Sequence, residues 1–293
     1  MVLRHWWPTR TPRQGIACSC VVDNHPKFYA QGALWVNCLL QYQKIPPEQV
    51  FVHLIQPADP IFTAWLIHQG IQVIPTTPFD ERSPHCNKLA QLTTNFGAKA
   101  RQIVLMDCDT VWLGNSSLPH IKDVAAKIVD NPNPSPEILA RIFAAAGFQP
   151  PHWTDASFPK SEGSCDTDSN NCNGGLYILT QEILPALAEA WTRWARWCLE
   201  HRHLFGSSIN FDQVSYALAA RQLGIKTQLL GLEWNYPTHH PEWPVPNLDP
   251  QIIHYHNRVT SRMEVLPIGK QRPDAAIARF NHAMERMVEF LAC

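Results

Sequence analysis

Charged side chains are scarce in this sequence. Asp, Glu, Lys and Arg make up 17% of the residues, and the 25 acidic and 24 basic side chains leave a formal net charge of −1. A balance this close to neutral gives no electrostatic basis for non-specific binding to nucleic acid or to an anionic membrane surface. We therefore expect no nucleic-acid partner.

Long apolar runs are also missing. No stretch of about 18 consecutive apolar residues is present, so no membrane-spanning helix is expected. The segment Met1–Gly15 is basic and rich in tryptophan, and it lacks the apolar region of a secretory signal. These absences predict a soluble, cytoplasmic protein.

The cysteines lack the spacing of a metal-binding or disulfide framework. There are nine of them, an odd number, and no Cys-x-x-Cys motif occurs. Cys165 and Cys172 flank a polar loop, so a disulfide between these two remains an open alternative at this point.

What the sequence does contain is an alternation of short apolar runs with helical patterns. Its 293 residues, 45% of them hydrophobic, suit one large domain. Each apolar run is continuous, which is typical of an α/β sheet covered on both faces. Residues 16–114 are predicted to form a doubly wound nucleotide-binding half. Predicted strands there are 16–22, 50–55, 71–74 and 103–106, and predicted helices are 26–40, 61–69 and 87–96.

The remainder of the 1–293 domain divides into two parts. Residues 115–170 are rich in Pro, Ser, Asp and Asn, and we interpret them as an insertion or lid. Regular patterns return over 171–293. Predicted strands there are 176–179, 227–230 and 251–255, and predicted helices are 184–198, 212–222 and 277–291.

Two aspartates directly follow one of the predicted strands. Asp107 and Asp109 come after the apolar residues 103–106, at the end of a strand where open α/β sheets bind ligands. The chain turns there, so both carboxylates can converge on one hard divalent cation, which also binds substrate phosphates. The same spacing recurs at Asp166 and Asp168 without an apolar strand before it, and we assign that copy to a loop.

Two later segments place polar residues beside predicted elements. Asn173, Gly174 and Gly175 precede an apolar strand, and the glycines allow either a positive φ with close backbone approach to a ligand, or only a tight turn. Asn210 is a candidate N-cap, and Asp212 lies in the first turn of the predicted helix. Asp212 either interacts with the helix dipole alone or faces a ligand.

Histidines cluster near the last predicted strand. His254 ends this strand and His256 lies two residues beyond it, and each is either structural or a ligand that completes a carboxylate metal site. A zinc site built from His239, His240, His254 and His256 is an alternative, but the spacing is not that of a helix-borne site.

In their order along the chain, these motifs resemble those of glycosyltransferase family 8, which has the GT-A fold. That family has an early strand ending in an Asp that contacts the base, then Asp-x-Asp, Asn-x-Gly, Asp-Gln and a late strand with His. The corresponding residues are Asp23 and Asn24, Asp107 to Asp109, Asn173 to Gly175, Asp212 and Gln213, and His254 to Asn257. The resemblance spans residues 16–258 and implies a mixed, mostly parallel sheet flanked by helices, with the acceptor half in 171–293.

The resemblance implies a metal-dependent, retaining transfer of a sugar from a nucleoside diphosphate, with a UDP-sugar favoured. An inverting transfer, with Asp212 as the base near the acceptor hydroxyl, is the open alternative. The acceptor is an unidentified carbohydrate, lipid or protein. By resemblance, Asp107, Asp109 and His254 would hold Mn²⁺ or Mg²⁺. Asp212 and Gln213 would act at the reacting centre and, with Asn173 and Gly175, face the transferred sugar. The residues implied to bind the donor are Asp23, Asn24, Lys88, Cys108, Asn173, Gly174, Gly175 and Arg258.

The sequence departs from the family pattern near its end. Asn257 stands where the family has Gly, and the Lys-Pro-Trp that follows in the family is missing. Arg258, Arg262 or Lys270 could supply the positive charge for the leaving diphosphate. Val214 follows the Asp-Gln pair instead of Asp or Gly. The chain therefore resembles a divergent member.

Two alternatives come from other classes of protein. Asp107 to Val111 fits the signature of haloacid-dehalogenase-type phosphatases, with Asp107 as nucleophile and Asp109 as general acid. Against this, the motif lies far from the first strand and the late acidic pair of those enzymes is missing. A sugar-binding module that has lost catalysis would be marked by loss of the metal-binding acids, but both are present.

Overall fold

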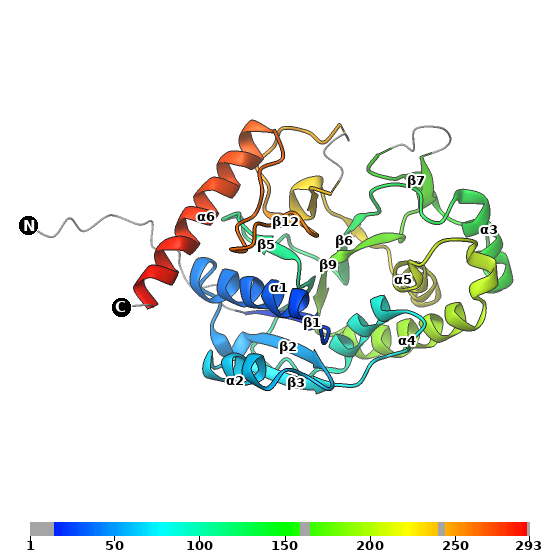
Figure 1. Ribbon diagram of the computed structural model, residues 1–293. Helices are drawn as coiled ribbons and strands as arrows, with labels where there is room; N and C mark the ends of the chain where they lie inside the picture. Colours follow the sequence, from blue (N-terminus) through cyan, green and yellow to red (C-terminus); the bar gives the residue numbers. More distant parts are fainter. Residues whose placement is uncertain (1–14, 159–164, 240–243, 292–293) are drawn as a thin grey trace, which may run out of the picture.

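A seven-stranded mixed sheet forms the centre of the molecule (Figure 1). The computed structural model describes residues 15–158, 165–239 and 244–291. The sheet strands are β1 (Ile16–Val22), β2 (Val50–Ile55), β3 (Gln72–Thr76), β4 (Gln102–Asp107), β6 (Val124–Ile128), β9 (Cys172–Thr180) and β10 (Gln228–Leu229). Their order is β10-β6-β9-β4-β1-β2-β3, in which β9 runs antiparallel to β4 and β6 and the other pairings are parallel.

Two smaller sheets and several helices complete the fold. One small sheet contains β11 (Tyr236–Pro237), β12 (Ile252–His254) and β5 (Thr110–Trp112), and the other pairs β7 (Trp153–Asp155) with β8 (Asp166–Asp168). The α-helices are α1 (Pro26–Asn37), α2 (Pro60–His68), α3 (Pro136–Ala145), α4 (Leu184–Glu200), α5 (Phe211–Leu223) and α6 (Gln271–Leu291). A π-helix spans Cys38–Tyr42, and 3-10 helices span Pro47–Gln49, Pro84–Thr93, Arg202–Phe205 and Leu232–Trp234.

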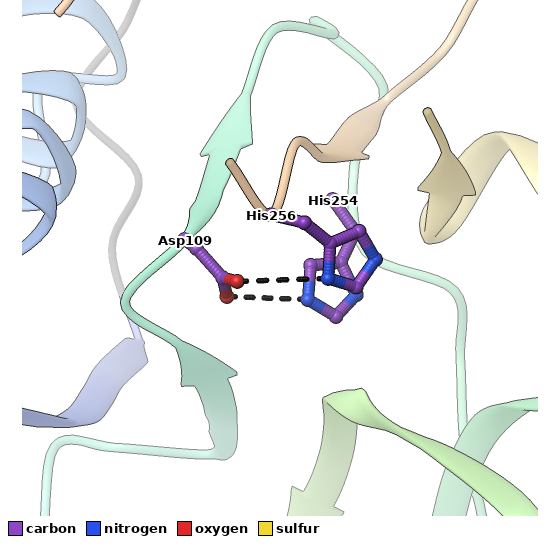
Figure 2. A group of neighbouring side chains, drawn as sticks. All are labelled: Asp109, His254 and His256. Carbon is purple, nitrogen blue, oxygen red and sulfur yellow. Dashed lines mark ion pairs between the residues drawn. The ribbon is translucent and has the colours of Figure 1, made fainter. Parts of the chain in front are cut away.

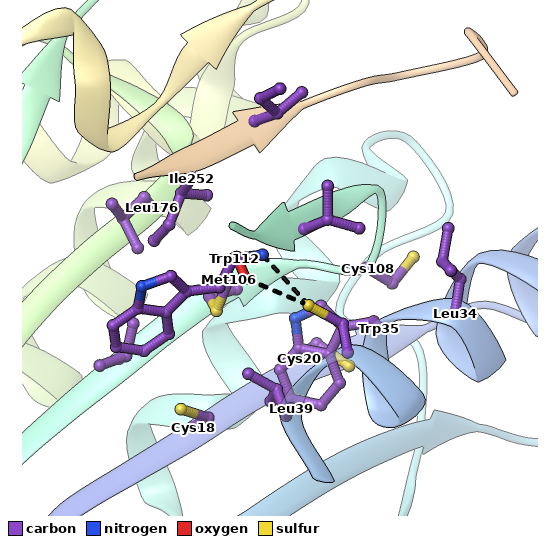
Figure 3. Close-up of a cluster of buried hydrophobic side chains, with 14 of the residues drawn as sticks. Cys18, Cys20, Leu34, Trp35, Leu39, Met106, Cys108, Trp112, Leu176 and Ile252 are labelled. Carbon is purple, nitrogen blue, oxygen red and sulfur yellow. Dashed lines mark hydrogen bonds between the residues drawn. The ribbon is translucent and has the colours of Figure 1, made fainter. Parts of the chain in front are cut away.

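The main sheet is buried on both faces by two apolar clusters. On β1, Cys18 and Cys20 belong to one cluster and Ala17 to the other, as the two-residue repeat of a strand requires. The first cluster includes side chains of α1 and of the β5–β12 sheet (Figure 3). It also includes side chains of α6, and the second cluster includes those of α4 and α5. With both faces covered, the strand ends are left as the place where polar side chains can meet a ligand.

The α/β class and most of the predicted elements are confirmed. The predicted strands 16–22 and 50–55 coincide with β1 and β2, and the predicted strand 103–106 lies within β4. The predicted helix 87–96 differs, because a 3-10 helix spans Pro84–Thr93 instead, with proline at its start.

Strand β6 is the main element that the sequence pattern did not indicate. It lies in the segment 115–170 that we interpreted as an insertion, yet it pairs with β9 and β10 in the main sheet. A lysine, Lys127, interrupts its apolar run. In the structure Lys127 is 1% exposed and forms an ion pair with Asp130, so its charge is compatible with a buried strand.

Two further features concern the cysteines and the helices. Cys165 and Cys172 are free thiols, which answers the question that their spacing left open. Among the helices that the structure describes, none combines the length and the apolar character needed to cross a bilayer.

The second Asp-x-Asp copy has a structural role. Our prediction of a loop at Asp166 and Asp168 is wrong, because these residues form β8. Asp168 is fully buried and accepts hydrogen bonds from the backbone N–H of His152 at 2.7 Å and of Asn170 at 2.9 Å. It also forms an ion pair with Arg221 at 3.4 Å. A buried carboxylate with this many partners stabilises the fold rather than binding a ligand.

We predict that Asp168→Ala lowers the free energy of unfolding by roughly 3 kcal/mol, because it leaves the partly buried Arg221 guanidinium and two backbone N–H groups without their acceptor. Chemical denaturation measures this change. An Asp166→Ala variant serves as the comparison, because Asp166 is exposed. Equal stability losses in the two variants would contradict the structural role of Asp168.

Candidate functional site

Polar side chains gather around a cavity of about 790 Å³ at one edge of the main sheet. Asp23 follows β1 and Asp107 ends β4. Because β9 is antiparallel to β4, its amino-terminal residues reach the same edge. The predicted site residues that line the cavity are Asp23, Lys88, Asp107, Cys108, Asp109, Asn173, Gly174, Gly175, Asp212, Gln213 and His254.

Local pairing places Asp109 next to His254. The hydroxyl of Thr110 donates to the backbone carbonyl of Asp107 at 2.7 Å, which closes the turn after β4. Strand β5 then pairs antiparallel with β12, with Thr110 opposite His254. The backbone N–H of Tyr255 donates to the carbonyl of Asp109 at 3.0 Å. The two segments, far apart in sequence, are therefore held together by backbone hydrogen bonds.

Asp109, His254 and His256 form a cluster that fits a divalent cation (Figure 2). One carboxylate oxygen of Asp109 lies 3.1 Å from Nε2 of His254, and the other lies 3.7 Å from Nδ1 of His256. The candidate ligand atoms of the three residues all lie within 4.8 Å of one another. Carboxylate and imidazole are ligands that suit Mn²⁺ and similar ions. The backbone carbonyl of His256 accepts a hydrogen bond from the Gln31 side chain, which ties the cluster to α1.

Charge pairing shifts the pKa of both members of the Asp109–His254 pair. Burial lowers the pKa of His254, but the neighbouring Asp109 carboxylate outweighs it, so this pKa lies above its ordinary value of 6.5. For Asp109, burial raises the pKa, but the His254 imidazolium outweighs burial and lowers the pKa to about 2. The two groups therefore stabilise each other's charged forms.

Lys88 joins three parts of the site. Its Nζ lies 3.0 Å from Asp107 Oδ1 and 3.1 Å from Asp212 Oδ2, and it donates to the Gly174 carbonyl at 3.0 Å. Burial lowers the pKa of Lys88, but the Asp107 and Asp212 carboxylates outweigh it and hold the pKa above its ordinary value. Asp212 lies in the first turn of α5 and is 3% exposed. A single charged ammonium thus bridges the predicted metal motif and the predicted reacting centre.

The two glycines sit in an irregularity of β9. The regular register pairs Ala126 with Tyr177, but Ile128 then pairs with Cys172 rather than with Gly175. The segment Asn173–Gly175 is therefore extra relative to β6 and bulges from the ladder. Neither glycine has a positive φ, so that part of the expectation is wrong, and both lie in strand β9 rather than in a tight turn.

Side chains crowd these glycines. A Cβ at Gly174 would contact Lys88 Nζ and lie 2.9 Å from Asp212 Oδ2. A Cβ at Gly175 would lie 2.5 Å from His254 Nδ1 and 3.1 Å from the side-chain amide of Asn235. The missing Cβ atoms therefore leave the space that Lys88 and His254 occupy.

Asp23 lies at another part of the cavity wall. Its Oδ1 accepts a hydrogen bond from Asn87 Nδ2 at 2.7 Å, and Asn87 Oδ1 in turn accepts from the backbone N–H of Phe79. Burial raises the pKa of Asp23, and the hydrogen bond from Asn87 and the nearby His85 oppose this shift. The carboxylate is thus oriented, with its second oxygen left out of this hydrogen bond.

Three predicted residues are placed differently from the rest. Asn24 and Arg258 are not among the described residues that line the cavity. Asn24 accepts a hydrogen bond from the Tyr29 hydroxyl at 2.5 Å, and Arg258 donates to the Pro267 carbonyl at 2.8 Å. Asn210 precedes α5 without a side-chain capping hydrogen bond, so the predicted N-cap interaction is not formed, although Asn210 does line the cavity.

The structure also brings residues into the site that the motifs did not indicate, namely Asn87 and Asp130. His256 lines the cavity as well; the sequence left open whether it is structural or a metal ligand, and the set of metal ligands implied by the resemblance did not include it. The four-histidine zinc arrangement differs from the group observed, which pairs His254 and His256 with Asp109. His239 contacts the His256 ring at a centroid distance of 4.1 Å, and His240 lies outside the described residues. Nothing in the sequence indicated that Asp130 belongs to the site, because the strand before it, β6, was not predicted.

No protein-family model matches the sequence, and no curated protein matches it. Solved structures do match. LgtC, described as a galactosyltransferase in complex with donor and acceptor sugar analogues, has a TM-score of 0.54 at 9% identity, covering 91% of this chain and 95% of that one. An active-site mutant of LgtC, a Gln-to-Glu change, has a TM-score of 0.54 at 11% identity, over 92% and 95%.

A further similar structure is that of the bifunctional glycosyltransferase WbbM in its apo form. Its TM-score is 0.50 at 13% identity, and the match covers 93% of this chain and 51% of WbbM. At such low identity these matches show the fold alone. The predicted fold class is confirmed: the chain has the GT-A fold, and these structural neighbours are glycosyltransferases.

We predict that the Asp109–His254 pair makes the stability of the metal-free protein depend on pH. The pKa of His254 is raised in the folded protein. The stabilisation that the pair contributes is therefore complete below about pH 6.5, the ordinary pKa, and is lost as the pH rises through the folded pKa. Asp109→Asn should lower the pKa of His254 and remove this dependence. NMR titration of the His254 imidazole measures its pKa. Chemical denaturation at pH values below and above about 6.5 measures how stability depends on pH. His53, whose pKa burial lowers to about 4, is the internal control and should titrate unchanged.

Gly175→Ala is expected to displace His254 from Asp109, because β9 cannot move away without breaking its pairing with β4. The pKa of His254 should then fall, and thermal stability should decrease. Gly97→Ala is the matched control, since no atom lies within 4 Å of a Cβ there and only its φ of +76° opposes the change. The crowding argument fails if His254 titrates identically in the Gly175 variant and the wild type.

Proposed function

We propose that the protein is a metal-dependent glycosyltransferase that transfers a sugar from a nucleoside diphosphate, with a UDP-sugar favoured, to an acceptor. The observation that supports this most is that two charged groups of residues line the same cavity. One is the cation-binding cluster of Asp109, His254 and His256, and the other is the Lys88 ammonium between Asp107 and Asp212. A cation bound by the cluster, together with the Lys88 ammonium, would supply positive charge for a diphosphate leaving group.

The divalent cation, proposed to be Mn²⁺, would be held by Asp109 and His254. Asp107 is the third ligand implied by the family resemblance, whereas His256 is the third member of the cluster in the structure. Asp107 is already paired with Lys88, and its Oδ2 lies 4.0 Å from His254 Nε2. When bound, such a cation acts as a Lewis acid towards the phosphate oxygens of the donor.

The remaining site residues divide the cavity by chemistry. Asp23, oriented by Asn87, is proposed to accept a hydrogen bond from the nucleoside base. Lys88 is proposed to offset the negative charge that grows on the leaving diphosphate. Asp212 and Gln213 are proposed to face the transferred sugar, which becomes oxocarbenium-like as its bond to phosphate breaks. We propose retention of configuration at the anomeric carbon on the basis of the resemblance of Asp212 and Gln213 to the family pair.

The phosphatase alternative is not favoured. Its signature residue Thr110 closes the turn after β4 through the carbonyl of Asp107. Asp107, the nucleophile in that alternative, shares the Lys88 ammonium with Asp212. The similar structures named above are glycosyltransferases.

We predict that UDP raises the melting temperature only when Mn²⁺ is present, and that Asp109→Asn abolishes this shift. A cation held by Asp109 would link metal binding to nucleotide binding, so losing this ligand would uncouple the two. Differential scanning fluorimetry with UDP, GDP, ADP and CDP, with and without Mn²⁺, measures the effect. Hydrolysis of the corresponding sugar nucleotides is the second readout.

Asp166→Asn is the matched control for that experiment. It neutralises the first aspartate of the second Asp-x-Asp copy, which lies in β8 and does not line the cavity. This variant should bind UDP and Mn²⁺ as the wild type does. The proposal is abandoned if no nucleoside diphosphate binds with metal, or if the protein releases phosphate from simple phosphomonoesters instead.

A further inference from the structure

Lys127 is a buried cation beside the site but outside its wall. It lies in β6, is 1% exposed, and is not among the described residues that line the cavity. Its ammonium forms an ion pair with Asp130 Oδ1. Burying a charge is costly unless it is paired, and replacing such a pair with apolar side chains is often no less stable. Stability alone therefore does not explain a lysine at this position.

Asp130 connects this lysine to the cavity. Its backbone is held on both sides, since Val129 N–H donates to the Asn171 carbonyl at 3.1 Å and Phe158 N–H donates to the Asp130 carbonyl at 2.7 Å. Its second carboxylate oxygen, Oδ2, accepts a hydrogen bond from Asn173 Nδ2 at 2.6 Å. The carboxylate therefore lies between the ammonium and the amide of Asn173.

The orientation of the Asn173 amide is determined by these partners. Asp130 beside a charged lysine can only accept, so the amide NH₂ must face it. On the opposite side, Asn173 Oδ1 accepts from the backbone N–H of Gly175 at 2.9 Å and from Asn235 Nδ2 at 3.0 Å. Both ends of the amide are thus assigned without ambiguity, and one of its two N–H groups stays available at the cavity wall.

We propose that Lys127 is a positioning residue for sugar recognition. Acting through Asp130, it fixes the Asn173 amide so that its second N–H donates to an oxygen of the transferred sugar. This inference rests on the proposed function, because it requires a sugar nucleotide in the cavity. The proposed function assigns the nucleoside and the diphosphate to other residues, so losing Lys127 should weaken binding of the sugar and not of the nucleotide.

Comparing UDP with a UDP-sugar separates binding of the nucleotide from binding of the sugar. We expect Lys127→Met to weaken binding of UDP-glucose or UDP-galactose by about tenfold, the effect of one well-placed hydrogen bond, and to leave UDP binding unchanged. Isothermal titration calorimetry with Mn²⁺ present measures both. If the single variant does not fold, Lys127→Met combined with Asp130→Asn removes the unpaired charge. The new amide can donate as well as accept, so it no longer fixes Asn173, and this variant should also weaken binding of the UDP-sugar and leave UDP binding unchanged.

A double-mutant cycle tests whether Lys127 acts through Asn173. Asn173→Ala should weaken the UDP-sugar by a similar factor, and adding Lys127→Met to it should cause no further loss. Arg221→Met is the matched control, since it breaks another buried ion pair, with Asp168, away from the cavity. It should lower thermal stability without changing either dissociation constant.

The outcomes distinguish this inference from the proposed function. If the wild type binds neither UDP nor a UDP-sugar with metal, both are overturned. If the wild type binds both ligands and Lys127→Met changes neither, or weakens both equally, only the positioning role is overturned. Additive losses in the cycle with Asn173→Ala also contradict it.

Discussion

The arrangement of the site depends on the need to neutralise buried and partly buried carboxylates. Asp109, Asp130 and Asp212 line the same cavity. A charge that is largely removed from water is costly unless an opposite charge lies next to it. Each acid has its own partner: His254 for Asp109, Lys127 for Asp130, and Lys88 for Asp212. The cations come from elements far apart along the chain, so satisfying these charges holds the edge of the sheet, the 3-10 helix and β12 in one relative position.

The sheet topology is what brings those partners together. The parallel strands β1 and β4 end at the cavity, and the antiparallel strand β9 begins there. The irregularity that makes Asn173–Gly175 extra relative to β6 turns the start of β9 towards the cavity. The glycines within it leave room for Lys88 and His254 to reach their carboxylates. Because Lys88 and His254 pack directly against the glycine backbone, a single methyl group added at either glycine should disturb the site.

How far the sequence could predict this site differs from one residue to another. Asp107 and Asp109 were recognisable because a continuous apolar run precedes them, and the run is a physical signal of a buried strand. The copy at Asp166 and Asp168 shows that the spacing itself means little, since Asp168 is fully buried in a structural network. Asp130 gave no signal, because the charge of Lys127 concealed the strand before it. Asn24, assigned by family order alone, and Arg258, one of three candidate cations without a family counterpart, are not among the described residues that line the cavity.

The sequence by itself determined the α/β class, the position of its main strands and the polar residues at their ends, because burial on both faces of a strand requires a continuous apolar run that can be read locally. Only the tertiary structure decided which of those residues meet. The pairing of β5 with β12 joins Asp109 to His254 across more than a hundred residues, and the bulge of β9 brings Asn173 to Asp130. Such contacts depend on register and packing between distant segments, for which the local pattern along one chain contains no signal.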